Sequence, residues 1–261
     1  MNETKGFTVV IPARFGSTRL PGKPLIDLNG KPMIQRVVER ALASQASRVI
    51  VATDSSRIVA ALEDSGIDVV LTSPEHASGT DRIAEAVAQL DLTEEDVVVN
   101  VQGDEPLIPP VVIDQAAELV MSDPNFGVAT LYEPMQEIED VFNPNIVKVV
   151  VSVGNRAMYF SRAPIPWERG RFDDHRVTGS AQQWKRHIGI YAFKLWALAR
   201  FVALPPSRLE KLESLEQLRL LESNVAIAID ESRTAIPAGV DTQADVDRVR
   251  MHLHDDSNHL A

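Results

Sequence analysis

Apolar positions in the first part of the chain follow two alternating patterns. Short apolar runs predict strands at 7–11, 48–52, 69–71 and 97–101. Apolar residues spaced three and four apart predict helices around 34–42, 58–62 and 83–90, the second ended by Gly66 and the third capped by Gly79 or Thr80. The run VVVNV at 97–101 has the uninterrupted form of a strand buried on both faces. Strands that alternate with helices in this way predict a mostly parallel sheet with helices packed on it.

The pattern changes after Pro110. Further apolar runs predict strands at 126–131, 146–153, 157–161, 187–193 and 226–229, with a hairpin turn at Gly154-Asn155 and a long polar loop over 164–185. Ser207 and Glu210 form a capping box before a leucine-rich helix, and Thr242 caps a last helix. The whole chain, 1–261, is therefore predicted to form one α/β domain with an inserted β-rich segment.

Composition narrows the class of protein. The 261 residues carry 26 Lys and Arg against 37 Asp and Glu, a net charge of −11, which argues against non-specific binding of nucleic acid. The chain has no cysteine, which excludes disulfides, a thiolate nucleophile and Cys-ligated zinc. No apolar run is long enough to span a bilayer, and residues 1–7 lack the apolar core of a signal peptide. We therefore expect no membrane insertion and a cytoplasmic location.

Positive charge is concentrated at the start of this acidic chain. The first 36 residues hold two acidic residues and the cations Lys5, Arg14, Arg19, Lys23, Lys31 and Arg36. Arg14, Arg19 and Lys23 belong to the Gly-rich loop PARFGSTRLPGKP, directly after the first predicted strand. Backbone N–H groups and cations at the carboxyl edge of a sheet predict an anion site. The spacing fits neither a Walker A loop nor the dinucleotide motif, and the alternative is a solvated surface loop.

Two acidic motifs could complete this site. Asp104, in VQGDEP, follows the buried strand, and Gly103 beside it lets a ligand approach the backbone. A carboxylate near a phosphate loop suits Mg²⁺, which takes one or two protein oxygens together with phosphate oxygens and water. Asp241, in GVDT, could be a second such carboxylate. Each aspartate could instead cap a helix, and spacing does not decide the role of Asp241.

Weaker candidates are spread over the rest of the chain. Ser78-Gly-Thr-Asp-Arg82 stands at a helix start, where N–H groups bind a base or carboxylate or are simply capped. Arg162 and His187 lie on predicted strands, and a single histidine there is usually structural. Glu216 and Gln217 lie opposite part of the leucine stripe, where they either reach a ligand or face water.

Taken together, the motifs resemble one enzyme family. They are PARFGSTRLPGKPL, ATD, SGTDR, VQGDEPL, YFSRAPIPW, HIGIY, LExLEQLR and GVDT, in this order along nearly the whole chain. The set resembles the 3-deoxy-manno-octulosonate cytidylyltransferases, or CMP-Kdo synthetases, whose sugar substrate is abbreviated Kdo. The resemblance implies a Rossmann-like nucleotide-diphospho-sugar transferase fold, with a mostly parallel central sheet and helices on both faces, and a homodimer. It also implies the reaction CTP + Kdo → CMP-Kdo + diphosphate in lipopolysaccharide assembly, with Mg²⁺ as cofactor.

The same resemblance implies roles for individual residues. Arg14 and Lys23 would clamp the triphosphate and Asp104 and Asp241 would hold Mg²⁺, and these four would be the catalytic residues. The nucleotide would be bound by Ala13, Arg14, Lys23, Ser78, Gly79 and Gln102, and the sugar acid by Arg82, Arg162, His187, Tyr191, Glu216 and Gln217. Residues 1–110 would bind the nucleotide, 111–200 the sugar and the partner subunit, and 201–261 would complete the site.

Two other functions remain open at this point. A cytidylyltransferase for a related acid sugar, such as 8-amino-Kdo or a sialic acid, could share these motifs, because one pocket side chain can change the substrate. A non-catalytic nucleotide-binding protein could keep the fold. The second is disfavoured, because a binding module would not need both Asp104 and Asp241.

Overall fold

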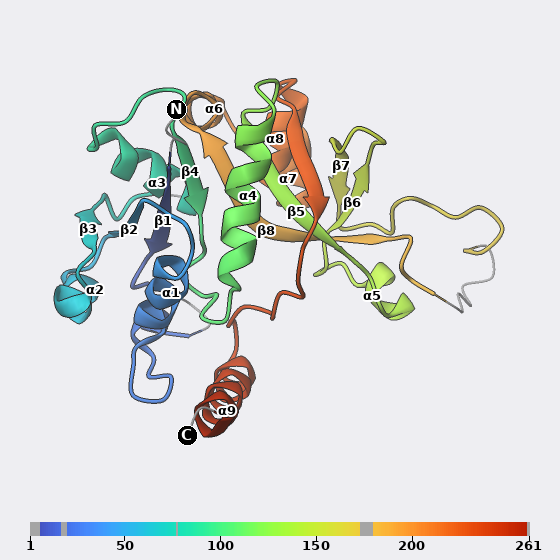
Figure 1. Cartoon of the computed structure of the whole chain (residues 1–261). Coiled ribbons are helices and arrows are strands. Elements are labelled where there is room, and N and C mark those ends of the chain that lie inside the picture. Colours follow the sequence, from blue (N-terminus) through green and yellow to red (C-terminus); the bar gives the residue numbers. More distant parts are fainter. Residues whose placement is uncertain (1–5, 17–19, 77, 173–179, 260–261) are drawn as a thin grey trace.

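The structure is a computed structural model that describes residues 6–16, 20–76, 78–172 and 180–259. In these residues a sheet runs through the molecule in the order β3-β2-β1-β4-β8-β5-β9 (Figure 1). Its strands are β1 (Phe7–Ala13), β2 (Arg48–Thr53), β3 (Asp68–Leu71), β4 (Val97–Asn100), β5 (Val128–Pro134), β8 (Lys185–Lys194) and β9 (Ile227–Glu231). Neighbours are parallel except at β8, which is antiparallel to β4 and β5. The predicted mostly parallel sheet is confirmed.

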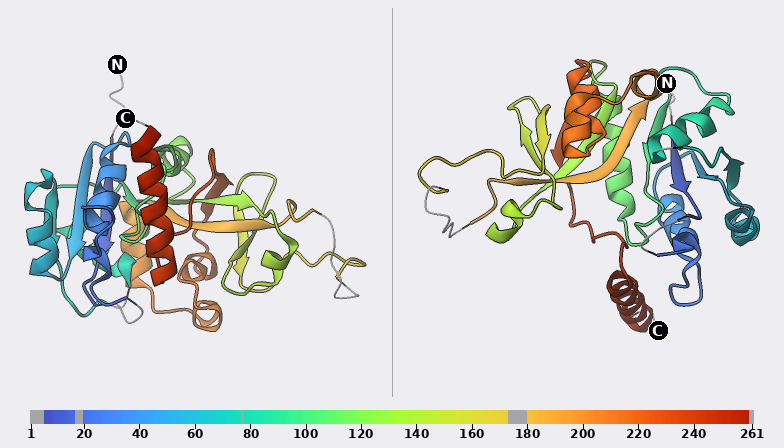
Figure 2. Two further views of the ribbon diagram at one scale, coloured as in Figure 1. Left: turned by 90° about the horizontal axis from the view of Figure 1, so that it is seen from below. Right: turned by 180° about the vertical axis from the view of Figure 1, so that it is seen from behind.

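Helices cover both faces of the sheet, as predicted. Side chains alternate across a strand, so Val9 and Val10 on β1 belong to separate cores. One core packs α1 (Met33–Leu42), α2 (Ser56–Ala61) and α4 (Pro110–Ser122) against one face. The other packs α3 (Gly79–Ala88), α6 (Leu195–Ala203) and α8 (Gln217–Glu222) against the opposite face. Figure 1 looks onto the face covered by α4, and the right-hand view of Figure 2 onto the other.

The sequence pattern does not predict α4 and α6, because both lack a clear polar face. In α4 the buried positions include Val112, Ile113 and the polar Asp114 and Gln115, so nearly every side of the helix is enclosed. The sequence of α6, LWALARFVA, is apolar almost throughout. The polar stripe from which a helix is recognised is therefore missing in both, in α4 through burial and in α6 because exposed positions such as Val202 and Ala203 are themselves apolar.

Two helix boundaries differ from the prediction. Ser78, and not Gly79 or Thr80, caps α3, because its Oγ accepts a hydrogen bond from the N–H of Asp81 (3.2 Å). The helix predicted after Ser207 is interrupted at Ser214, whose left-handed φ of 52° separates α7 (Arg208–Glu213) from α8. The predicted capping box itself is present. The interruption places residues 214–217 along the wall of a cavity described below.

The segment 111–200 contributes two strands to the row of the central sheet and a hairpin attached to it. β5 and β8 lie within the row of strands given above, whereas β6 (Lys148–Val151) and β7 (Ala157–Ser161) form an antiparallel hairpin that joins the same sheet where β6 pairs with β8. The predicted turn between these two strands is present, with Asn155 at a φ of 52°. The described part of the loop 164–185 builds a small aromatic core, in which Phe172 stacks on Trp184 with ring centroids 5.1 Å apart.

The helix α9 (Gln243–His259) lies below the sheet in Figure 1, after an extended segment. Val246 and Val249 of this helix pack in one cluster with Leu28 and Met33, which precede and begin α1. This packing brings the segment before α9 to the side of the sheet where β1 ends. The remaining short helices are η1 (Lys23–Leu25), η2 (Glu63–Ser65) and α5 (Ile138–Phe142). In the described part of the chain, no helix combines the length and the apolar character that crossing a bilayer requires.

Candidate active site

A cavity of about 290 Å³, here called the first cavity, opens where β1 and β4 end. These strands are parallel neighbours, so the loops that follow them emerge at the same edge of the sheet. The predicted nucleotide residues all line it, namely Ala13, Arg14, Lys23, Ser78, Gly79 and Gln102. Asp104 and Asp241 line it too. Arg19, part of the predicted anion loop, lies outside the described residues.

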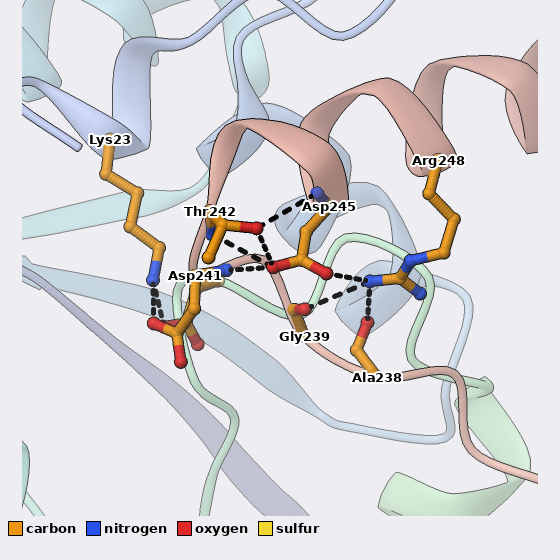
Figure 3. A network of polar contacts seen from close by, with 8 residues as sticks. Lys23, Ala238, Gly239, Asp241, Thr242, Asp245 and Arg248 are labelled. Atoms are coloured by element: carbon orange, nitrogen blue, oxygen red, sulfur yellow. Dashed lines mark hydrogen bonds and ion pairs between the residues drawn. The ribbon is translucent and has the colours of Figure 1, made fainter. Parts of the chain in front are cut away.

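Lys23 joins the two predicted metal ligands. Its Nζ lies 2.6 Å from Oδ2 of Asp104 and 3.1 Å from Oδ1 of Asp241, and Figure 3 shows the lysine pointing at Asp241. The lysine side chain is 12% exposed, against 38% for that of Asp104 and 53% for that of Asp241. Two carboxylates from distant parts of the chain therefore share one largely buried cation at the wall of the first cavity.

Backbone contacts bring these carboxylates together. The N–H of Val240 donates to the carbonyl oxygen of Asp104 (2.9 Å), so the segment before α9 runs beside the loop after β4. Position 103 requires glycine, because a Cβ there would lie 2.9 Å from the carbonyl oxygen of Pro12. A Cβ on Gly239 would lie 3.2 Å from the carbonyl oxygen of Asp104. These two glycines let three chain segments approach closely enough to form the site.

The cap of α9 is built by Thr242 and Asp245, and Asp241 faces Lys23 instead (Figure 3). Oδ2 of Asp245 accepts hydrogen bonds from the Thr242 hydroxyl (2.8 Å), the Thr242 N–H (2.9 Å) and the Asp241 N–H (3.1 Å). These bonds, above all that of the Thr242 hydroxyl, lower the pKa of Asp245 to about 2. The predicted cap at Thr242 is confirmed. Asp241, which could also have capped the helix, does not do so, because Thr242 and Asp245 make the cap contacts.

Asp54 anchors the loop that carries Arg14. Its Oδ1 accepts a hydrogen bond from the N–H of Phe15 (3.2 Å), and its Oδ2 lies 2.9 Å from Nη2 of Arg82. Arg82 lines the first cavity, but its side chain is 4% exposed and Nη1 donates to Oγ1 of Thr72 (2.5 Å). The charge of Arg82, a predicted sugar ligand, is thus balanced by Asp54 inside the protein.

A second cavity, of about 240 Å³, adjoins the first, because Gln102 lines both. The predicted sugar residues His187, Tyr191, Glu216 and Gln217 line this second cavity. Its described lining contains no lysine or arginine, whereas that of the first cavity contains Arg14, Lys23 and Arg82. A cavity lined by cations therefore adjoins one whose described lining mixes polar and apolar side chains and has no lysine or arginine.

Burial sets the charge state of the second cavity. Burial lowers the pKa of His187 to about 3, so this imidazole is neutral near pH 7. Burial also raises the pKa of the Glu216 carboxyl, against the effect of a hydrogen bond from Oγ1 of Thr80 (3.1 Å). The pKa of Tyr191 is raised well above its usual value, first by burial. In the described structure, the Tyr191 hydroxyl is the single buried side-chain polar atom without a hydrogen-bond partner.

The predicted sugar-binding residue Arg162 lies outside both cavities, and the cavity residue His76 was not predicted. Arg162 is absent from the described lining of both cavities. Its N–H donates to Oε2 of Glu213 (2.9 Å) and its Nε to the Glu213 carbonyl (2.6 Å), next to the bend at Ser214. His76 lines the first cavity and contacts Glu85, and its position two residues before Ser78 is the signal that could have found it.

Among the described residues, no cluster of three or more His, Cys, Asp or Glu side chains could hold a metal by itself. Asp104 and Asp241 offer paired carboxylates at the first cavity, where a cationic group already lies between them. Two protein oxygens leave most coordination positions to phosphate and water, which is the pattern that Mg²⁺ prefers.

Comparison with known proteins places the chain in a family. The model of the family described as Cytidylyltransferase matches residues 8–227. The 3-deoxy-manno-octulosonate cytidylyltransferase of Cellvibrio japonicus is 54% identical over 249 residues, which cover 95% of this chain and 98% of the relative. That of Alcanivorax borkumensis is 50% identical over 247 residues, with the same shares of 95% and 98%.

Solved structures agree with this placement. The structure of a CMP:2-keto-3-deoxy-manno-octonic acid synthetase complexed with CTP has a TM-score of 0.87 and 40% identity, covering 96% of this chain and 99% of the other. A 4-diphosphocytidyl-2C-methyl-D-erythritol synthase, with a TM-score of 0.63 and 12% identity, shares the fold alone. The chain therefore belongs to the cytidylyltransferases, and within them to the 3-deoxy-manno-octulosonate cytidylyltransferase family that its motifs resemble.

Proposed function

We propose that this protein transfers CMP from CTP to Kdo and releases diphosphate. The observation that carries the proposal is the pair of adjoining cavities, with Gln102 in the wall of both. One is lined by cations and paired carboxylates, and the described lining of the other is a mixture of polar and apolar side chains without lysine or arginine. A triphosphate fits the first and a polyhydroxylated sugar the second, so the two substrates meet between them.

In the first cavity, Arg14 and Lys23 bind the triphosphate of CTP. Ala13, Ser78, Gly79 and Gln102 lie around the cytosine and ribose, with His76 beside them. Gly79 opens α3, whose N–H groups add partial positive charge. The contact between Asp54 and the N–H of Phe15 keeps the loop of Arg14 in place before CTP binds.

Asp104 and Asp241 are the residues that would hold Mg²⁺. Their oxygens are the hard donors that this ion prefers, and the ammonium of Lys23 between them indicates that the pair attracts positive charge. When bound, Mg²⁺ supplies neutralisation of phosphate charge and a lower pKa for a coordinated hydroxyl. Lys23 would then turn from the carboxylates toward the phosphates.

The charges of the two cavities orient the sugar acid. Its carboxylate and the neighbouring anomeric hydroxyl face the first cavity, where Arg14 and Lys23 lie, because the described lining of the second cavity offers Glu216 and no cation. The polyol chain then extends into the second cavity, between His187, Tyr191 and Gln217.

This orientation sets up an in-line transfer. The anomeric oxygen bonds to the α-phosphorus of CTP while the bond to the β-phosphate oxygen breaks, diphosphate leaves, and the hydroxyl proton passes to solvent. No enzyme nucleophile takes part, so the protein contributes position and charge. Arg14 and Lys23 offset the charge that grows on the leaving diphosphate.

A diphosphate-release assay tests the proposal. CTP and Mg²⁺ are supplied with Kdo, 8-amino-Kdo or sialic acid in turn. We expect release with Kdo, and with the other two at a kcat/KM lower by at least about ten-fold, the effect of about 1.4 kcal/mol. Preference for another sugar would contradict the assignment of Kdo as substrate. If no sugar led to release of diphosphate, the alternative of a non-catalytic nucleotide-binding protein would remain.

The homodimer, the cytoplasmic location and the division of the chain at 110 and 200 are further parts of the proposal. An exposed apolar surface on the β6–β7 hairpin supports a dimer contact there, because Val153 and Met158 are exposed at its turn and on β7. Light scattering on the purified protein measures its mass, and a monomer at micromolar concentration would contradict the dimer.

A further inference from the structure

Thr130 lies behind the second cavity at an irregularity of the sheet. The register of β5 against β8 shifts directly after this residue, which is fully buried. Its Oγ1 lies 2.7 Å from the carbonyl oxygen of Ile190, 3.0 Å from that of Ile188 and 3.0 Å from Nε2 of His187. One buried hydroxyl therefore meets two backbone acceptors and the ring of a residue that lines the cavity.

The supply of protons fixes the direction of these hydrogen bonds. The Thr130 hydroxyl has one proton, and the carbonyl oxygens of Ile188 and Ile190 can only accept. If the hydroxyl donated to His187 instead, both carbonyl oxygens would face a bare oxygen at 2.7 and 3.0 Å. The hydroxyl therefore donates to a carbonyl and accepts from His187, so Nε2 of His187 carries a proton.

The second nitrogen of this ring is bare. The ring is partly accessible because it lines the cavity, but it lies deep in the molecule, and burial lowers the pKa of His187 to about 3. A neutral imidazole has one proton, and that proton is on Nε2. The Nδ1 of His187 is therefore an acceptor. The ring is also held in orientation by Phe160, at 4.8 Å between centroids and 75° between planes, and by Tyr191, at 5.5 Å and 53°.

We propose that Thr130 is a positioning residue that locks His187 in its Nε2–H tautomer, so that Nδ1 accepts a hydrogen bond from a neutral hydroxyl group of the sugar substrate. The nature of the ligand rests on the proposed function, whereas the tautomer does not. Tyr191 lies beside His187 with its ring tilted by 53°, so it helps to hold the imidazole in orientation. The bare Nδ1 and the Glu216 carboxyl disfavour an anion, so this part of the cavity selects the polyol and not the carboxylate.

The tautomer is measured on the ligand-free protein. Nitrogen NMR of the ¹⁵N-histidine-labelled chain at pH 7 distinguishes a protonated from a bare ring nitrogen, and His187→Asn identifies the signals of His187 by their loss. We expect a neutral ring with the proton on Nε2. Thr130→Val, close in shape but without a hydroxyl, should give a mixture of tautomers, and Thr130→Ser should restore the original one. A charged ring, a proton on Nδ1, or an Nε2–H tautomer unchanged in Thr130→Val would overturn the proposal.

Kinetics of the same variants test the consequence for the substrate. Thr130→Val should lower kcat/KM for Kdo about ten-fold, the effect of one hydrogen bond, and leave KM for CTP unchanged, while Thr130→Ser stays near the wild type. Equal losses for both substrates would reduce Thr130 to a general structural role and overturn its positioning role. If the wild type gave the expected tautomer but no turnover with Kdo, the proposed function would fall while the tautomer assignment stood.

Discussion

Replacement of Asp104 by asparagine separates the catalytic from the structural role of the first cavity. The change keeps the size of the side chain and removes one negative charge, and Lys23 keeps Asp241 as a partner at 3.1 Å. The lost contact, Lys23 Nζ to Asp104 Oδ2 at 2.6 Å, involves a carboxylate that is 38% exposed. Solvent screening therefore limits the loss of unfolding free energy to about 1 kcal/mol. The loss of a metal ligand should instead raise the barrier by about 3 kcal/mol, a fall in kcat of about 10²-fold or more.

The assay compares kcat with stability in the same variant. Diphosphate release is followed at saturating CTP, Kdo and Mg²⁺, and the free energy of unfolding is taken from urea titrations. The matched control is Asp68→Asn, which also breaks a carboxylate contact, with Arg48 at 2.6 Å, but on the exposed edge strand β3. We expect the control to keep its kcat. A near-normal kcat in Asp104→Asn would refute the assignment of this carboxylate, and a loss of several kcal/mol of stability would refute the view that the contact is mainly functional.

Three further predictions concern single residues. Lys23→Ala should raise KM for CTP about ten-fold or more and make this KM less sensitive to salt. The control Lys31→Ala, at an exposed lysine beside Glu39, should change neither quantity. Equal effects of the two substitutions would contradict the role of Lys23 in binding the triphosphate. Gly103→Ala, whose Cβ would meet the Pro12 carbonyl oxygen at 2.9 Å, should lose about 1–3 kcal/mol of stability in urea, and Gly154→Ala, with nothing within 4 Å, should lose little. The pKa of His187 is lowered by burial from 6.5 to about 3, so the unfolded chain binds a proton there that the folded protein does not. Stability should therefore fall as the pH is lowered from 6.5 toward 3, by up to about 1.4 kcal/mol per unit, and His187→Asn should flatten this dependence in unfolding curves.

The sequence predicts the parts of the fold in which one face of an element meets water or in which a strand is buried throughout. The strands β1, β2 and β4 and the helix α1 are of this kind. The helices α4 and α6 are not predicted, because neither has a polar stripe. In α4 most positions are buried, whereas in α6 exposed positions such as Val202 are themselves apolar. The break between α7 and α8 is not predicted, because it depends on the backbone conformation of Ser214 alone. Contacts from residues distant in sequence, such as Arg162, hold the backbone there.

The candidate site was predictable where its chemistry is carried by short motifs. The loop after β1, the VQGDEP segment and GVDT each predict a part of the first cavity, and the structure brings them together through the bond from Val240 to Asp104. Spacing could not decide the role of Asp241. In the structure, Asp245 accepts the hydrogen bonds of the N–H groups of Asp241 and Thr242 before α9, so the side chain of Asp241 is not needed as a helix cap. The pairing of Arg82 with Asp54 and the position of Thr130 behind His187 depend on three-dimensional packing, which no local pattern contains.

The shared wall of the two cavities has a consequence for the design of inhibitors. Since Gln102 lines both, a single compound that joins a cytidine phosphate to a short polyol can occupy them together. Linking the halves makes the second contact intramolecular, so modest affinities combine into a strong one if the linker matches the geometry. The polyol half needs no charge, because the described lining of its cavity contains no lysine or arginine. Such a compound would carry fewer negative charges than the two natural substrates do together.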